Sequence, residues 1–366
     1  MPIMNKKNNK LWYVETNKDK INLEEVCLFL NNEYKNYLYN SNWTYKYFKW
    51  KIENINPNGL GYIAVTKSGD KILGTLTLTR KKILLNNEII NSFEIGDSYI
   101  KKNIYKYYQP KNILNNKDKF INKSVFGRMV HDLLDKIPDD SLVYGSPNKE
   151  SENGYIKNLN FEIYNNSKIY NFLSPSIYSV IRIKTINYFF NTLKKIFFYL
   201  IKYISNIQIS NNLDINDFNN NLIDNKKNYL NIFFDKKIFK HRFLDIPVKK
   251  YSYFKIYNSK KQIKAIIIYK IIKTQKNRDI CYILDIFTEN SFLKYAIFLF
   301  KINFNNKFVH AYIFWCNYDY KFDLNLNSFI KYDTISTIFY KNKFYMENIY
   351  RKKIYLNFKI SSFDVV

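Results

Sequence analysis

The sequence predicts a two-domain α/β protein in which each domain contains a mixed sheet. The chain has 366 residues, which is too long for one ordinary domain, and 46% of them are hydrophobic, enough for two cores. Segments with the alternation of strands are interspersed with segments of helical spacing. An antiparallel meander, a helix and a strand follow one another in the first half, and this order returns in the second half, which suggests an internal duplication.

In the first domain, alternation predicts an opening strand, and helical spacing after Asn22, a suitable N-cap, predicts the first helix. Three strands joined by turn signals then form the meander. Ser124 caps a second amphipathic helix, and a buried strand, a short helix and a further strand follow. The expected elements are strand 10–17, helix 22–38, strands 61–66, 71–85 and 88–100, a helix from 124, strand 141–147, and a helix and strand within 151–166.

The second domain is expected to start near residue 229, after a polar segment, 207–228, that reads as a linker. A hairpin, a helix and two strands are predicted to build it. These elements are strands 261–275 and 279–289, helix 291–302, and strands 308–316 and 353–361. The predicted division is therefore 1–170, 171–228 and 229–366, with an amphipathic helix and the linker in the middle segment.

The middle segment contains a stretch, 178–206, that is rich in Ile, Phe and Tyr. Basic residues interrupt it, so no run of ~20 uncharged apolar residues forms, and no transmembrane segment is predicted. At helical spacing, Lys184, Lys195 and Lys202 lie opposite the apolar residues. Two interpretations stay open: a helix packed between domains, or a basic helix in weak contact with a membrane surface.

The net charge of +27 first suggests a polyanionic partner. Lys, Asn, Ile, Tyr and Phe are all abundant, whereas there are only 8 Gly and 7 Pro, a bias typical of an AT-rich genome. Much of the lysine excess is therefore interpreted as a solvated surface. Because no arginine-rich cluster or aromatic-basic RNA motif accompanies the charge, nucleic acid is not the expected partner, although the charge would favour phosphate-bearing ligands.

The cysteines and histidines show no spacing typical of a metal site or a disulfide framework. They are Cys27, Cys281, Cys316, His131, His241 and His310. We therefore expect no metal and a reducing compartment. The basic N-terminus lacks an apolar segment of signal-peptide length, which predicts a cytoplasmic protein.

Several segments together resemble the core of the GNAT N-acyltransferase superfamily. They are the meander 61–85, FEIGDSYI at 93–100, KSVFGRMV at 123–130 and VYGSPNKESENGYIKNLNF at 143–161. The chain is similar especially to tandem, two-domain members found near surface-polysaccharide and sugar-modification genes. The resemblance covers residues 10–165 and, more weakly, 229–366. It implies a GNAT-like N-acyltransferase domain followed by a degenerate GNAT-like domain.

The resemblance also implies a site. The strand 94–100 would splay from its neighbour to admit the pantetheine arm of CoA, with Glu94 or Asp97 as the base and Gly96 permitting a bulge. Tyr155 would protonate the departing thiolate, since a phenol is protonated at neutral pH. A loop leading into a helix would bind the pyrophosphate through backbone N–H groups. The implied CoA-binding residues are Asn122, Lys123, Ser124, Phe126, Gly127, Arg128 and Asn148.

In the second copy, Phe239–Pro247 resembles the opening segment, and Asp285 lies on the strand that corresponds to 94–97. The helix after it has no glycine, so this copy is expected to have lost CoA binding and to shape the acceptor pocket. The implied activity is transfer of an acyl group from an acyl-CoA to a small amine such as a nucleotide-linked amino sugar. Acetyl is the expected acyl group, and acetyl-CoA is the expected co-substrate. The alternatives are a FemABX-like transferase that uses aminoacyl-tRNA, and a non-catalytic binding protein of GNAT fold.

Overall fold

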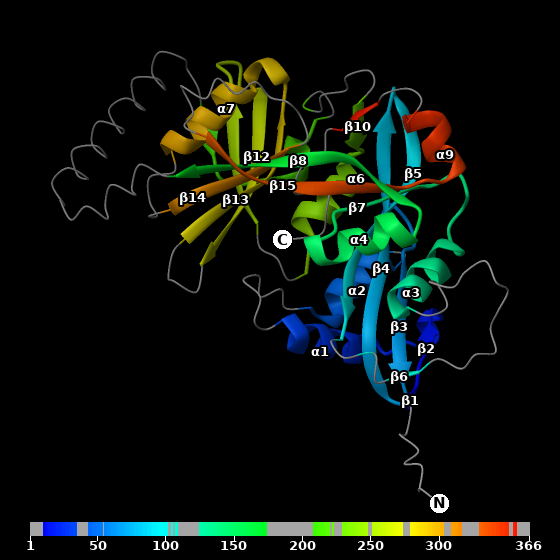
Figure 1. The fold of residues 1–366 in the computed structure, drawn as a ribbon. Coiled ribbons are helices and arrows are strands. Elements are labelled where there is room, and N and C mark those ends of the chain that lie inside the picture. The colour runs from blue at the N-terminus through cyan, green and yellow to red at the C-terminus, as the bar shows by residue number, and fades with distance from the viewer. Residues whose placement is uncertain are drawn as a thin grey trace, which may run out of the picture. The chain divides into compact units, whose positions relative to one another are not determined.

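The structure is a computed structural model (Figure 1). It describes residues 10–34, 43–53, 55–101, 104, 107–108, 124–173, 208–219, 222, 229–247, 251–273, 279–303, 309–316, 329–350 and 354–356. The predicted helix 178–206 and the loop residues Asn122 and Lys123 lie outside these ranges.

The chain divides into two compact units that are not contiguous in sequence. The first unit comprises residues 1–82, 90–164 and 336–353, and the second comprises 83–89, 165–335 and 354–366. Residues near the end of the chain therefore complete the N-terminal unit. The domain boundaries at 170 and 228 stay a prediction. The structure adds that segment 336–353 belongs to the N-terminal unit.

The first unit contains a mixed sheet in the order β2-β3-β4-β5-β7-β15. Its strands are β1 (Lys10–Leu11), β2 (Tyr13–Glu15), β3 (Tyr62–Ser68), β4 (Lys71–Leu85), β5 (Glu88–Ile100), β6 (Tyr107–Tyr108), β7 (Leu142–Gly145), the start of β8 (Phe161–Leu173) and the end of β15 (Phe329–Tyr340). Its helices are η1 (Lys18–Lys20), α1 (Leu23–Tyr34), α2 (Tyr45–Ile52), α3 (Val125–Leu134), α4 (Lys149–Asn158), α9 (Lys343–Tyr345) and the π-helix η7 (Met346–Tyr350). The short strands β1 and β6 pair with each other.

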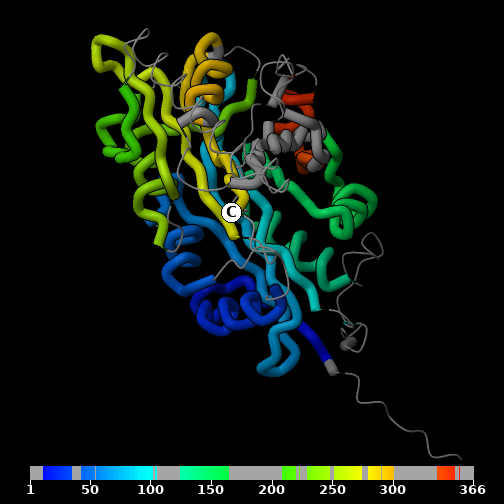
Figure 2. The backbone as a smooth tube through the Cα atoms, turned by 90° about the vertical axis from the view of Figure 1, so that its left-hand side faces the viewer, coloured from blue at the N-terminus to red at the C-terminus, as the bar shows by residue number. Residues whose placement is uncertain are grey.

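Helices cover both faces of this sheet: α1 and α2 lie on one face, and α3 and α4 on the other (Figure 2). Apolar residues of α3 and α4 form one core with the strands. They include Met129, Val130, Leu133, Tyr155 and Leu159. The predicted caps are confirmed, because the Ser124 side chain accepts a hydrogen bond from the Gly127 N–H at 3.0 Å and that of Asn22 from the Glu24 N–H at 3.0 Å.

The second unit repeats the strand order of the first. Strands β11 (Ser252–Tyr257), β12 (Ile263–Lys273) and β13 (Asp279–Thr288) are antiparallel, α7 (Asn290–Asn303) follows, and β14 (Val309–Cys316) pairs with β13 in parallel. This matches β3, β4, β5, α3 and β7. The other elements are β9 (Gln208–Ser210), η4 (Ile215–Asp217), β10 (Tyr229–Ile232), α6 (Lys236–Phe239), the π-helix η6 (Lys240–Leu244) and β16 (Tyr355–Leu356).

The polar segment 207–228 contains more structure than a linker. β9 pairs with β11, and Phe218 and Leu222 are buried beside α6. The polar composition of 207–228 did not reveal this structure, because only a few apolar side chains of the segment pack in the core.

Two surface properties bear on the predictions. Among the described residues, no helix is both long enough and apolar enough to span a bilayer.

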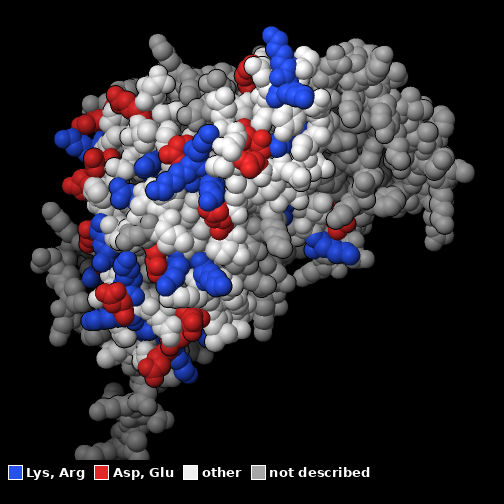
Figure 3. Space-filling view, turned by 180° about the vertical axis from the view of Figure 1, so that it is seen from behind, with Lys and Arg blue, Asp and Glu red and all other residues white. Residues whose placement is uncertain are grey.

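Lysines and arginines on the face seen in Figure 3 are intermixed with Asp and Glu. That face therefore does not present the one-sided basic surface expected of a nucleic-acid interface.

Candidate functional site

Strands β5 and β7 part in the middle of the first unit. They pair in parallel from Ser92, opposite Leu142, to Ile95, opposite Gly145, and β5 continues to Ile100 with no further partner on this side among the described strands. A Cβ atom on Gly145 would lie 2.5 Å from Ile95 Cγ2, so only glycine allows the close approach at this last pair. The pairing of the two strands therefore ends at Ile95, next to the segment 94–100 for which the resemblance implies a splay.

The alternation of β5 changes phase just beyond this point. Phe93 and Ile95 face the core under α3 and α4, and Ile100 packs against the same core. Asp97 breaks the regular backbone with a φ of +45°, a left-handed conformation that Asp tolerates better than most residues. Its side chain consequently points to the other face, toward Lys51 of α2. The bulge expected at Gly96 is thus centred on the next residue.

The Asp97 carboxylate is held from two elements. Oδ2 accepts hydrogen bonds from Lys51 Nζ at 2.6 Å and from Thr77 Oγ1 on β4 at 3.0 Å. The backbone is held too, because Thr75 Oγ1 lies 3.1 Å from the Asp97 carbonyl oxygen. The Lys51 side chain is 1% exposed, so this is a buried, charge-assisted network.

Glu94 lies on the same face of the sheet. It is 4% exposed, and its Oε2 lies 3.4 Å from Lys81 Nζ. Gly96 separates it from the Asp97 network, since a Cβ there would be 3.8 Å from Glu94 Oε1 and 4.0 Å from Lys51 Nζ. Both predicted carboxylates therefore lie beside the splay, each next to a lysine.

The sequence reading missed Lys51 and Lys81. A signal for Lys51 was available, because it follows Phe48 by one helical turn and so falls on the apolar face of α2. A lysine at such a position is either paired or costly to bury. Lys81 offered a weaker signal, since it lies within β4 in a run of three basic residues, Arg80 to Lys82.

Tyr155 reaches the splay from the opposite face. It is 2% exposed, and its ring makes edge contacts with Phe126 of α3 and Phe161 of β8, with centroids 4.8 and 5.0 Å apart. Burial raises the pKa of its hydroxyl well above the usual value, and a hydrogen bond with Ser98 acts in the opposite direction. Tyr155 therefore contacts Ser98 on one face of β5, and the side chain of the adjacent residue, Asp97, points to the other face.

The predicted CoA-binding residues divide into two groups. Ser124, Phe126 and Gly127 lie in the first turn of α3, where backbone N–H groups favour anions, and Phe126 contacts Tyr155. Arg128 is instead paired along the helix with Asp132, with Nε 2.8 Å from Oδ1. Asn148 caps α4, because its Oδ1 accepts a hydrogen bond from the Ser151 N–H at 2.8 Å.

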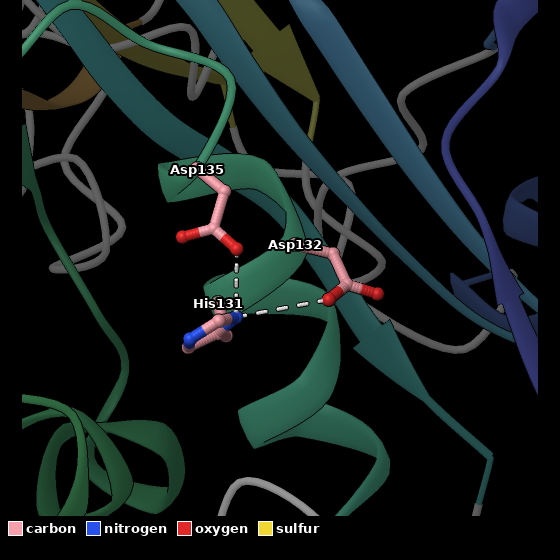
Figure 4. A group of neighbouring side chains, drawn as sticks. All are labelled: His131, Asp132 and Asp135. Atoms are coloured by element: carbon pink, nitrogen blue, oxygen red, sulfur yellow. Dashed lines mark ion pairs between the residues drawn. The ribbon is translucent and has the colours of Figure 1, made fainter. Parts of the chain in front are cut away.

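One cluster on α3 has the composition of a metal site. His131 Nδ1 lies 3.1 Å from Asp135 Oδ2 and 3.8 Å from Asp132 Oδ1 (Figure 4). Because the Asp132 carboxylate is already paired with Arg128, the arrangement is that of ion pairs along one exposed helix face. We assign no metal to it.

No protein-family model matches the chain, and no curated protein matches it by sequence. Solved structures do match. A conserved protein from Enterococcus faecalis V583, described as a "Probable N-Acyltransferase", superposes with a TM-score of 0.51 at 10% identity, covering 90% of this chain and 71% of that one. A GCN5-related N-acetyltransferase from Anabaena variabilis gives 0.53 at 12%, covering 90% and 72%. Saccharomyces cerevisiae N-myristoyltransferase with bound myristoyl-CoA gives 0.53 at 12%, covering 93% and 79%.

The chain has the GNAT fold. The mixed sheet with its parted parallel strands is the part of the GNAT fold that the sequence resemblance predicted. Matches at 10 to 12% identity show the fold alone. The chemistry must therefore be argued from the residues around the GNAT splay.

Proposed function

We propose that the protein transfers an acyl group from an acyl-CoA to a small amine. One observation carries the proposal: where the pairing of β5 with β7 ends, a buried phenol lies on one face of the sheet, and the buried Glu94 and the partly buried Asp97 lie on the other. Acyl transfer from a thioester to an amine needs a proton acceptor and a proton donor on either side of the reacting carbon. The structural similarity to acyltransferases, one of them with bound myristoyl-CoA, supports acyl-CoA as the donor.

In the proposed reaction the amine nitrogen attacks the thioester carbonyl. A C–N bond forms, the C–S bond breaks, and one amine proton passes to a carboxylate, Glu94 or Asp97, directly or through water. The departing sulfur takes a proton from Tyr155. Because burial keeps the pKa of Tyr155 high, the phenol stays protonated between turnovers. The protonated carboxylate releases its proton to water and the phenolate takes one from water, which restores both groups.

The pyrophosphate of CoA is proposed to bind at the N-terminus of α3. Ser124, Phe126 and Gly127 belong to its first turn, and Asn122 and Lys123 of the preceding loop are retained as predicted contacts. Arg128 would contribute only by exchanging its partner Asp132 for a phosphate. Asn148 keeps its predicted contact to the CoA arm through its amide nitrogen, since its oxygen caps α4.

The identity of the acceptor rests on the sequence resemblance. A nucleotide-linked amino sugar in the cytoplasm, acetyl as the acyl group and a role in polysaccharide biosynthesis stay predictions. The competing FemABX-like reaction would use aminoacyl-tRNA, and the intermixed charges on the face seen in Figure 3 do not specifically support it.

Isothermal titration with acetyl-CoA and with myristoyl-CoA tests the proposal directly. We expect at least one of them to bind with a Kd below ~1 mM, which corresponds to about 4 kcal/mol. Free CoA released in the presence of a panel of amino sugars and amines then reports turnover. Tyr155→Phe is the matched control, because it keeps the packing of the ring and is expected to bind acyl-CoA but to turn it over slowly. Absence of binding to both acyl-CoAs would refute the proposal, and salt-sensitive binding of tRNA instead would favour the alternative.

A further inference from the structure

The second unit has a bulge at the corresponding position of its sheet, although Asp285, unlike Asp97, does not have a positive φ. The register of β12 and β13 shifts between Ile268, which lies opposite Asp285, and Tyr269, which lies opposite Ile283. Leu284 is therefore an extra residue on β13. The parallel pairing of β13 with β14 ends at Ile283 as well.

The positions in the two units correspond one to one. Asp97 comes two residues after Ile95, the last paired residue of β5, and Asp285 comes two residues after Ile283. Each aspartate lies on the face away from the long helix that connects the parallel strands. Asp285 is 2% exposed, and its neighbours Ile283 and Ile286 pack in the core with α7 on the opposite face.

The helices on this face also correspond. Thr44 is the N-cap of α2, and Lys51 comes seven residues after it. Asp235 is the N-cap of α6, and Arg242 comes seven residues after it. Arg242 is 8% exposed. The second unit thus retains a buried basic residue on the helix and a buried aspartate in the bulge, at the positions of Lys51 and Asp97.

The chemistry proposed for the first unit is not retained in the same way. The residue three positions before the bulge aspartate is Glu94 in the first unit and Tyr282 in the second. The α7 helix contains no glycine, whereas α3 has Gly127 in its first turn. A buried basic residue and an aspartate stand at corresponding positions of both units, so we assign them to what the two units share, which is the bulged strand.

We infer that Lys51 and Asp97 clamp the bulge of β5, that Asp97 is a positioning residue, and that Glu94 is the base. The catalytic part of this inference rests on the proposed function. Each carboxylate has a buried lysine beside it, but Lys51 Nζ lies 2.6 Å from Asp97 Oδ2, which also accepts a hydrogen bond from Thr77, whereas Lys81 Nζ lies 3.4 Å from Glu94 Oε2. Protonating Asp97 would therefore break the closer ion pair and leave Lys51 buried without its anionic partner. The clamp fixes a left-handed residue that would otherwise be unfavourable, and it thereby directs Ser98 toward Tyr155.

Hydrogen exchange tests the clamp without requiring turnover. In Lys51→Met, peptides covering 93–101 are expected to exchange at least ~10-fold faster than in the wild type, and in Lys51→Arg close to wild-type rates. Arg242→Met is the matched control in the second unit, expected to accelerate exchange around 282–288 and not around 93–101. If Lys51→Met does not fold, the double variant with Asp97→Asn removes the unpaired charge and is measured in its place. Unchanged exchange at 93–101 would overturn the clamp.

The pH dependence of acetyl-CoA turnover tests the base. Asn adopts left-handed backbone readily, so Asp97→Asn removes the anionic member of the clamp without adding a backbone penalty at the bulge. We expect it to lower kcat up to ~10²-fold through misplacement, with the acidic limb of the pH profile unchanged. Glu94→Gln is expected to lower kcat by about 10²- to 10⁴-fold and to abolish the acidic limb of the pH profile. The reverse pattern would make Asp97 the base. If the wild type turns over no amine, the proposed function fails, while the exchange experiment still decides the clamp.

Discussion

The Nζ atom of Lys51 lies 2.6 Å from Oδ2 of Asp97, although 46 residues separate them in the chain and the lysine side chain is 1% exposed. This pair joins helix α2 to the point where β5 leaves its parallel neighbour. The conformation of β5 at the proposed acyl-CoA site therefore depends on an ion pair that lies on the α2 face of the sheet, opposite Tyr155.

Removing one member of this pair is expected to be far more costly than removing both. Lys51→Met leaves the Asp97 carboxylate, whose side chain is 10% exposed, without its cationic partner, and the free energy of unfolding should fall by about 3 kcal/mol. The double variant Lys51→Met with Asp97→Asn should lose clearly less than the sum of the single variants. Urea denaturation followed by circular dichroism measures all three. Additive losses would show that the two side chains are not coupled.

Gly145 is expected to tolerate no side chain. Because an alanine Cβ would lie 2.5 Å from Ile95 Cγ2 and 3.2 Å from the Ile95 carbonyl oxygen, Gly145→Ala should cost about 1 to 3 kcal/mol and weaken acyl-CoA binding. Gly96→Ala is the control from the facing strand, since the nearest atom to its Cβ is 3.8 Å away. Thermal unfolding and acetyl-CoA titration compare the two. Equal effects would contradict the close approach at Gly145.

The buried phenol of Tyr155 should make stability depend on alkaline pH. Its folded pKa is raised above the unfolded value of about 10, so the unfolded state loses its proton first as the pH rises. The contribution is fully present below pH ~10 and is lost as the pH rises toward the folded pKa. Tyr155→Phe should therefore show a shallower loss of stability between pH 9 and 11 than the wild type, measured by urea denaturation. Identical slopes would show that the phenol is accessible to water.

Ser124 is expected to stabilise the helix that starts the proposed phosphate site. Ser124→Ala removes the acceptor for the Gly127 N–H and should cost ~1 kcal/mol, whereas Ser124→Gly should cost only a few tenths. In both variants acyl-CoA affinity should fall if this turn binds the pyrophosphate. Calorimetry and thermal unfolding separate the two effects. An unchanged affinity would place the phosphates elsewhere.

Local pattern accounts for the part of the fold that was predicted. The alternation and turn signals of 61–100 predicted the meander, and the two asparagines at its second turn, Asn86 and Asn87, have the positive φ that such turns require. The Ser124 cap likewise follows from short-range chemistry, whereas the splay of strand 94–100 was implied by the GNAT resemblance. The return of residues 336–353 to the first unit had no such signal, because strand partners distant in sequence leave no periodicity.

The sequence by itself determined the element order, the GNAT resemblance and the candidate carboxylates Glu94 and Asp97. Only the tertiary structure decided that these two residues share a face, and that Lys51 holds one of them. A regular strand would have placed Glu94 and Asp97 on opposite faces, because side chains alternate with a period of two. One left-handed residue reversed that alternation, and its stabilisation comes from a helix 46 residues away.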